Sequence, residues 1–417
     1  MRGAKDRILI IEDTHDILTW VGSTPLRDQY SIHSARDFQE AQIDLKHPQL
    51  RLVLLDLNFE NVSRQQLLNP KSPHLEGLAI LKQIRYRYPL HRVVMITAYP
   101  DPQTIRKAWD IGAIDYIEWD HLLADPTGSI EKIRAYIDLE SLPEMKWFLK
   151  HLSPVPPFLR LFFQLKKFVQ SGITFILVGF PGAPKDLIKS LIAHLSDTNV
   201  FSLDHPVSHR LSEALPEDSW LWVDHAEHID PFLQEKILRM SMKKSLPSIW
   251  FFHHPPSLYL QQKKISSQIL ALPVINIPQI SSLSAAERLE IFKHRLTVYG
   301  GDFSQFSSKA RAFLEDYLWP GDWFHLDQAA HALSLKSKHN GGTIHLTDVV
   351  EILGHPQDWK DDPIVKAFLR NHTIDEIERI MIHLALEECP TKEEAARRLG
   401  ISRATLYNKL REDTEKV

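Results

Sequence analysis

The segment RILIIED, residues 7–13, places four consecutive apolar residues directly before two acids. Residues 52–55, 93–96 and 116–117 form three further short runs that are also nearly all apolar. Such runs, separated by longer helical patterns, are typical of parallel strands that are buried on both faces of a sheet. We therefore predict a doubly wound α/β domain over residues 1–125.

Polar side chains stand where these predicted strands end. Glu12 and Asp13 follow the first run, Asp56 follows the second, and Thr97 follows the third. Ligands of open α/β sheets bind at the carboxyl ends of the strands. Converging carboxylates repel one another unless a cation lies among them, and Mg²⁺ suits an oxygen site of this kind. An ionised aspartate can then attack phosphorus, while a hydroxyl binds a phosphoryl oxygen.

The segments IIED, LLDLN, ITA and GAIDYI, with their spacing, resemble the flavodoxin-like receiver domains of two-component signalling. The resemblance implies that Asp56 accepts a phosphoryl group from a histidine kinase, and that Thr97 and Tyr116 form the switch pair. It also implies four Mg²⁺ ligands: Glu12, Asp13, Asp56 and the backbone carbonyl of Asn58.

Two departures from the receiver pattern bear on the switch. Trp119 and Asp120 stand where receivers carry Lys-Pro, so a phosphoryl-pairing cation is replaced by an aromatic ring. The loop between Asp56 and Gly77 is longer than usual by about a dozen residues, as either a lid or a simple insertion. The alternative to phosphorylation is a pseudo-receiver that keeps the fold and serves only dimerisation.

The rest of the chain is predicted to contain a second α/β region and two linkers. Strands are expected at residues 175–178, 220–223 and 249–252, and a helix-rich section from Ser284 to about Leu335. The predicted divisions are a helical linker at 126–152, an α/β domain with helical lid at 153–335, a linker at 336–372 and an all-α domain at 373–417.

The loop GFPGAPKD follows the strand at 175–178 and has part of a phosphate-binding loop. Gly179 and Lys185 have the right spacing, but Pro184 replaces the second glycine and has no N–H to offer a phosphate. Together with WLWVDHAEHID, in which Asp224 matches the Mg²⁺-associated aspartate, this region resembles the AAA+ domain of NtrC-type regulators.

Several catalytic positions of that family are changed. His225 replaces the water-activating Glu, Phe324 replaces the second-sensor Arg, and Ser266 and Leu272 fall on the arginine-finger positions. The segment FFHH lies where that family has its first sensor strand, but no Asn follows it. The stretch between Lys185 and Asp224 is too short for the loop that contacts the alternative sigma factor. Each lost group accounts for orders of magnitude in rate, so we predict a scaffold and do not expect ATP as a cofactor.

The last part of the sequence has the pattern of a helix-turn-helix. Thr391 with Glu394 has the form of a capping box, Gly400 supplies the turn, and Ser402 is a suitable N-cap. An apolar stripe before these helices, which includes Met381 and Leu384, predicts dimer packing. ISRATLYNKL closely resembles the Fis-type domain of NtrC-family regulators.

The DNA-reading helix is predicted from charge and position. Residues 392–411 contain six Lys or Arg and two acids, a net charge of +4, on a chain whose formal net charge is −4. The second helix would enter the major groove, with Arg403, Thr405 and Asn408 at base edges. The side chains expected to contact phosphates are Arg398, Ser402 and Lys409. The alternative is a charged helical hairpin for protein contact.

Bulk composition favours a cytoplasmic protein with no membrane association. The 417 residues contain one cysteine, Cys389, which cannot form an internal disulfide and fits a reducing compartment. The charged N-terminal segment is not that of a signal peptide. The longest apolar stretch, residues 158–180, is interrupted by Lys166 and Lys167 and is unsuited to span a bilayer.

We therefore predict a multidomain response regulator that binds palindromic double-stranded DNA as a homodimer or higher oligomer, without ATPase activity. One alternative is an ATP-dependent activator of the alternative sigma factor. Another is an interaction partner that forms mixed oligomers with an intact family member and dampens it.

Overall fold

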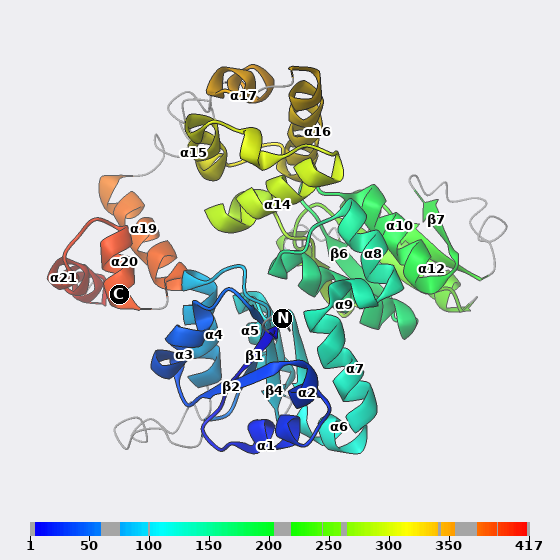
Figure 1. Ribbon diagram of the computed structural model, residues 1–417. Helices are drawn as coiled ribbons and strands as arrows, with labels where there is room; N and C mark the ends of the chain where they lie inside the picture. The colour runs from blue at the N-terminus through cyan, green and yellow to red at the C-terminus, as the bar shows by residue number, and fades with distance from the viewer. Residues whose placement is uncertain are drawn as a thin grey trace. The chain divides into compact units, whose positions relative to one another are not determined.

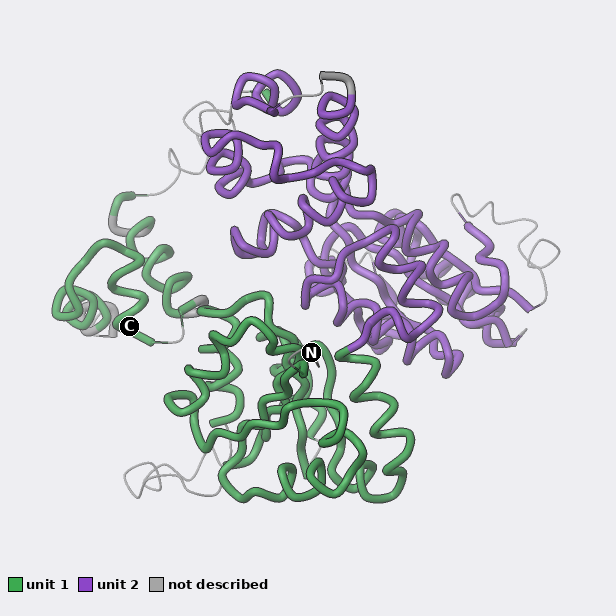
Figure 2. Tube along the Cα trace, in the orientation of Figure 1, with its two compact units in different colours: residues 1–137, 354–417 green, residues 138–353 purple. Residues whose placement is uncertain are grey.

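The computed structural model describes residues 5–59, 76–98, 101–203, 218–243, 245–259, 265–340, 343–354, 373–389 and 391–414 (Figure 1). The chain divides into two compact units, residues 1–137 with 354–417, and residues 138–353 (Figure 2). The predicted longer loop before Gly77 lies outside the described residues.

The first unit contains a parallel five-stranded sheet in the order β2-β1-β3-β4-β5. Its strands are β1 (Arg7–Ile11), β2 (Ser31–Ala35), β3 (Leu50–Asp56), β4 (Val93–Thr97) and β5 (Asp115–Glu118). This confirms the predicted doubly wound α/β domain. The four apolar runs all lie within strands, whereas β2, with the sequence SIHSA, lies at an edge and was not predicted.

Helices connect these strands, as parallel pairing requires. They are α1 (Asp16–Gly22), α2 (Leu26–Gln29), α3 (Phe38–Leu45), α4 (Glu76–Arg87), α5 (Pro102–Ile111), α6 (Trp119–Ala124) and α7 (Pro126–Ile137). The side chains of Asp37 and Asp101 accept hydrogen bonds from the first turns of α3 and α5, which fixes where these helices begin.

Three helices near the C-terminus complete the described part of the first unit: α19 (Ile374–Glu388), α20 (Lys392–Arg398) and α21 (Arg403–Thr414). They enclose a small apolar core of Ile382, Ala385, Cys389, Ala395, Ala396 and Leu406. The buried Cys389 thus packs as an apolar residue. A helix-turn-helix of this size is confirmed.

The second unit is built on another parallel five-stranded sheet, in the order β10-β6-β9-β8-β7. Its strands are β6 (Phe175–Val178), β7 (Asn199–Leu203), β8 (Ser219–Val223), β9 (Ser248–Phe252) and β10 (Val274–Asn276). The central strands β6, β8 and β9 match the predicted positions. The two edge strands were not predicted, because β7 is only partly buried and β10 has three residues.

Helices surround this second sheet and form a lid after it. Before the lid come η1 (Leu139–Ser141), α8 (Pro143–His151), α9 (Pro156–Gln170), α10 (Lys185–Ser196), η2 (Ala226–His228), α12 (Pro231–Lys243), η3 (Pro256–Tyr259), α13 (Ser267–Leu270) and η4 (Ile280–Ser282). The lid consists of α14 (Ala285–Val298), η5 (Phe303–Gln305), α15 (Ser308–Asp316), α16 (Asp322–Asn340) and α17 (Leu346–Leu353).

The unit boundaries differ in detail from the predicted divisions. The expected helical linker at 126–152 is shared between the units, because α7 belongs to the first and α8 to the second. The expected linker from residue 336 contains the end of α16 and all of α17, which contacts α15 and α16. Residues 355–372 of that linker lie outside the described part of the chain.

Candidate functional sites

The acidic residues predicted to form a pocket gather at the carboxyl ends of β1 and β3. Glu12 is 1% exposed, and its two carboxylate oxygens accept hydrogen bonds from the backbone N–H groups of Ile17 and Leu18, at 2.8 and 2.7 Å. Burial nevertheless raises the pKa of Glu12. The first turn of α1 therefore holds this side chain in place.

Asp56 ends β3 and carries the most perturbed carboxyl of this pocket. Burial, followed by the negative charges of Glu12 and Asp13, raises the pKa of Asp56 to about 7, although the backbone N–H of Asn58 donates to its Oδ1 at 3.0 Å. A group of carboxylates that disfavours its own ionisation suits a cation such as Mg²⁺. The donor set therefore fits the ion that the receiver resemblance implies.

The helix α4 packs closely against the end of β3 beside this pocket. A Cβ added at Gly77, in the first turn of α4, would lie 2.3 Å from the backbone oxygen of Asp56, so only glycine permits this approach. Thr97 is buried at the end of β4, which pairs with β3, and the ring of Tyr116 on β5 is 5.6 Å from Trp109. Trp119, at the lysine position, begins α6.

The helix-turn-helix has the local contacts that its sequence predicts. Thr391 accepts a hydrogen bond from the N–H of Glu394 at the start of α20, and Ser402 accepts one from the N–H of Thr405 at the start of α21. Gly400 has a φ of 70°, the left-handed conformation that the turn requires. The return bond of the capping box reaches the Thr391 hydroxyl and not its backbone.

Five of the six predicted DNA contacts are exposed: Arg398, Ser402, Arg403, Thr405 and Asn408. Lys409 is partly buried and forms an ion pair with Glu378 of α19, at 2.8 Å. The sequence pattern also places Ala385 in the apolar stripe of α19, but this residue packs in the core, whereas the stripe residues Met381 and Leu384 are 54% and 49% exposed.

The loop between β6 and α10 uses three of its backbone N–H groups within the protein. Gly179 donates to the carbonyl of Phe252 at 2.9 Å, Ala183 to Phe180 at 3.0 Å, and Lys185 to Ala183 at 2.8 Å. Pro184 has no N–H. A phosphate cradle needs successive N–H groups that face the ligand, and these groups face other carbonyls.

The same loop is attached to the helical lid. The N–H of Phe324 donates to the carbonyl of Gly182 at 3.1 Å, and a Cβ at Gly182 would lie 2.4 Å from the backbone oxygen of Gly321. The segment around Phe324, which the family resemblance places at the second sensor, thus packs on the loop. Phe324, at the arginine position, is exposed.

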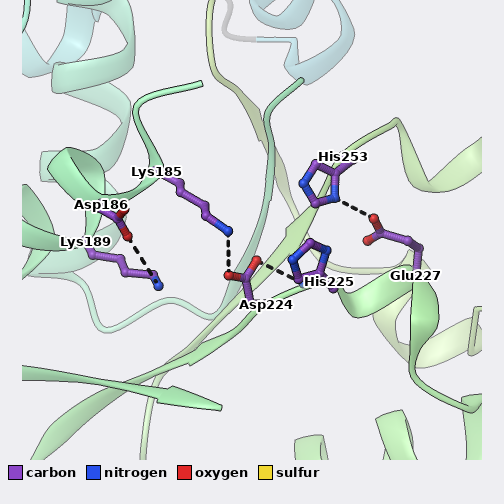
Figure 3. A network of polar contacts seen from close by, with 7 residues as sticks. All are labelled: Lys185, Asp186, Lys189, Asp224, His225, Glu227 and His253. Atoms are coloured by element: carbon purple, nitrogen blue, oxygen red, sulfur yellow. Dashed lines mark hydrogen bonds and ion pairs between the residues drawn. The ribbon is translucent and has the colours of Figure 1, made fainter. Parts of the chain in front are cut away.

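Lys185 is neutralised inside the unit. Its Nζ lies 2.9 Å from Oδ2 of the buried Asp224 (Figure 3). Burial raises the pKa of Asp224, but the hydrogen bond and charge of Lys185 outweigh it, and the net pKa is lowered. The two arginine-finger positions are also used structurally, since Ser266 caps α13 and Leu272 packs on the sheet core.

Comparisons with known proteins match two parts of the chain to family models. Residues 8–120 match the response regulator receiver domain, and residues 373–412 match the bacterial regulatory proteins of the Fis family. The alginate biosynthesis transcriptional regulatory protein AlgB of Pseudomonas syringae pv. tomato is 22% identical over 97% of both chains. The chain thus carries a receiver domain and a Fis-type domain, and it is similar over nearly its whole length to NtrC-type response regulators.

Two further known proteins are similar over nearly the whole chain. The transcriptional regulatory protein ZraR of Escherichia coli K12 is 23% identical, over 97% of this chain and 98% of its own. Among solved structures, NtrX from Brucella abortus in complex with ADP matches at 17% identity and a TM-score of 0.41, over 98% and 99% of the chains.

Two residues of the second unit, Glu227 and His253, were not predicted as functional. Glu227 and His253 lie with His225 in one cluster of possible metal ligands. The sequence carried the signal in HAEH and FFHH, but their proximity depends on the pairing of β8 with β9.

Among the described residues of the regulator, no helix combines the length and apolar character needed to cross a membrane.

Proposed function

We propose that this response regulator is a dimeric, sequence-specific DNA-binding transcription factor whose receiver is phosphorylated at Asp56 and whose middle domain does not hydrolyse ATP. The observation that carries the proposal is the exposed polar face of α21, presented by a helix-turn-helix with its own apolar core. An N-capped helix of this kind fits the major groove.

Base reading is proposed for Arg403, Thr405 and Asn408, and phosphate contact for Arg398, Ser402 and Lys409. Arg403 pairs with Glu393, and its guanidinium lies 5.5 Å from the centre of the Tyr407 ring. Binding a guanine edge would exchange the pair with Glu393 for a bidentate contact. Lys409 would likewise leave Glu378.

The direct test is a pull-down of genomic DNA fragments with the purified chain, with and without acetyl phosphate. We expect enrichment of a palindromic motif at modest salt, with affinity that falls steeply as salt rises. If no fragment is enriched under either condition, the proposal is wrong and the interaction-partner alternative is favoured.

In the receiver, the acidic pocket supports phosphoryl transfer from a histidine kinase. A carboxylate oxygen of Asp56 would form a bond to phosphorus as the phosphorus–nitrogen bond of phosphohistidine breaks, and the released imidazole would take up a proton. When bound, Mg²⁺ would supply positive charge that reduces the repulsion between the Asp56 carboxylate and the incoming phosphoryl group. Glu12, Asp13, Asp56 and the carbonyl of Asn58 are the proposed ligands.

The absence of ATP hydrolysis is proposed from the phosphate loop. The backbone N–H groups of Gly179, Ala183 and Lys185 are engaged by carbonyls, Pro184 has no N–H, and Lys185 is paired with Asp224. A phosphate-release assay on the purified regulator should therefore give no turnover above the background of a Lys185→Met variant. Turnover well above that background would favour the alternative, an ATP-driven activator of the alternative sigma factor.

A further inference from the structure

Three potential metal ligands converge in the second unit where two strands end. His225 and Glu227 follow β8, and His253 follows β9, the strand paired with it. One ligand atom from each side chain can be chosen so that all three lie within 4.8 Å of one another. Figure 3 shows the two imidazoles and the carboxylate turned toward one another.

Glu227 gives the strongest indication that this cluster binds a cation. It is 5% exposed, and its Oε1 lies 2.7 Å from Nδ1 of His253. Its Oε2 is buried and accepts no hydrogen bond from any described residue. A buried carboxylate oxygen without a partner is costly, and a cation bound to it would remove that cost.

Hydrogen bonds from α12 fix the backbone on both sides of Glu227. Gln234 of α12 is fully buried, and its side-chain amide donates to the carbonyls of Ala226 and Ile229, both at 3.0 Å. These bonds fix the short helix η2 at each side of Glu227. His225 has a φ of 50°, which turns it out of the strand toward His253, with 4.6 Å between the ring centres.

The ligand types select the class of metal. Imidazole nitrogen suits zinc and other late first-row divalent ions, whereas Mg²⁺ prefers oxygen ligands alone. Two histidines with one glutamate form a site that leaves coordination positions for water. The nearby ammonium of Lys185 is balanced by Asp224, so it does not repel a cation at this place.

We propose that His225, Glu227 and His253 bind one divalent transition-metal ion, of which zinc is the reference. The ion would lie beside His225, the residue that occupies the position of the water-activating glutamate in the family. The required movement is small, because ligand atoms around a tetrahedral zinc lie roughly 3.3 Å apart for bond lengths of about 2.0 Å. The three ligand atoms already lie within 4.8 Å of one another.

The test is a titration of the full-length, chelator-treated regulator with Zn²⁺ in competition with a chromophoric chelator. We expect one tight equivalent per chain, an increase in the melting temperature of the protein, and visible absorption bands of tetrahedral Co²⁺ when cobalt replaces zinc. Glu227→Gln should weaken zinc binding at least tenfold and abolish the cobalt bands.

Two further variants keep the outcome decisive. His225→Asn tests the site at a solvent-accessible position whose left-handed backbone asparagine tolerates, so it serves if Glu227→Gln does not fold. His121→Asn removes an exposed histidine of the receiver and controls for surface binding in a chain of 22 histidines. Equal zinc affinity in wild type, Glu227→Gln and His225→Asn would overturn the proposal, as would several weak equivalents and no tight one.

Discussion

At the scale of single residues, Asp56 links the acidic pocket to stability. Its pKa is about 7 in the folded protein, against about 4 in an unfolded chain. The folded state therefore binds more protons between these values, and its stability falls as pH rises through this range. We expect Asp56→Asn to stabilise the receiver at pH 8 without Mg²⁺, by on the order of 2 kcal/mol.

Urea unfolding followed by tryptophan fluorescence at pH 5 and pH 8 measures this effect. The gain from Asp56→Asn should be smaller at pH 5 and should shrink when Mg²⁺ is added. Asp28→Asn, at an exposed carboxylate, is the matched control. Labelling by acetyl phosphate should also be lost in Asp56→Asn, and equal labelling of both proteins would exclude Asp56 as the acceptor.

The pair of Lys185 and Asp224 gives a second residue-scale prediction. Lys185→Met would leave the buried Asp224 carboxylate without its partner, so we expect a loss of roughly 1–3 kcal/mol in the free energy of unfolding. The pKa of Asp224 should then rise, since the hydrogen bond and charge of Lys185 no longer oppose the effect of burial. The double variant with Asp224→Asn should recover part of the loss, and strict additivity would contradict the coupling.

At the scale of elements, α21 depends on the hydroxyl of Ser402 at its first turn. Ser402→Ala removes the acceptor of the Thr405 N–H and should destabilise the helix-turn-helix by about 1 kcal/mol. The melting temperature of the C-terminal domain, followed by circular dichroism, measures this loss. Ser402→Asp should retain the stability, whereas no difference between the two variants would show that the cap is unimportant.

The same helix carries the prediction for DNA recognition. Arg403→Ala should weaken binding to the selected site by roughly 1–3 kcal/mol and relax the preference at one base pair. Fluorescence anisotropy with matched and mismatched duplexes measures both effects. Arg106→Ala, at an exposed arginine of the receiver, should leave affinity unchanged. An identical footprint and affinity for Arg403→Ala would refute the assignment of this helix.

Which elements could be predicted from sequence depended on burial. Central strands such as β1, β3 and β6 are runs of apolar residues, because both of their faces are covered. The edge strands β2 and β7 lack that signal and were missed for this reason. The helix α17 lies within a predicted linker because its eight residues stand between two polar stretches of sequence.

Some site residues could also be predicted from the sequence, and others could not. Asp56 and the Ser402 cap could be predicted because each depends on residues close in sequence or on strand ends. The grouping of His225 with His253 could not, because it depends on the pairing of β8 with β9. The partner of Lys185 likewise became visible only when both strand ends were placed.

At the scale of the whole molecule, the exposed apolar face of α19 supports the proposed dimer. Leu384→Glu would place a charge on this face, so we expect a monomer with much weaker affinity for a palindromic site. Analytical ultracentrifugation and anisotropy measure the two changes. Leu123→Glu, at a leucine of the receiver that is 54% exposed, is the matched control. A dimer that persists in Leu384→Glu would contradict this role for α19.

The hydrogen bond from Phe324 to Gly182 has a consequence for cellular control. In an ATP-dependent protein of this kind, the bound nucleotide contacts both the sheet and the helical lid, so their relative position depends on which nucleotide is bound. Here a backbone hydrogen bond connects the loop to the lid directly, without a nucleotide. If the proposed function holds, this regulator would respond to its kinase while remaining indifferent to the energy charge of the cell.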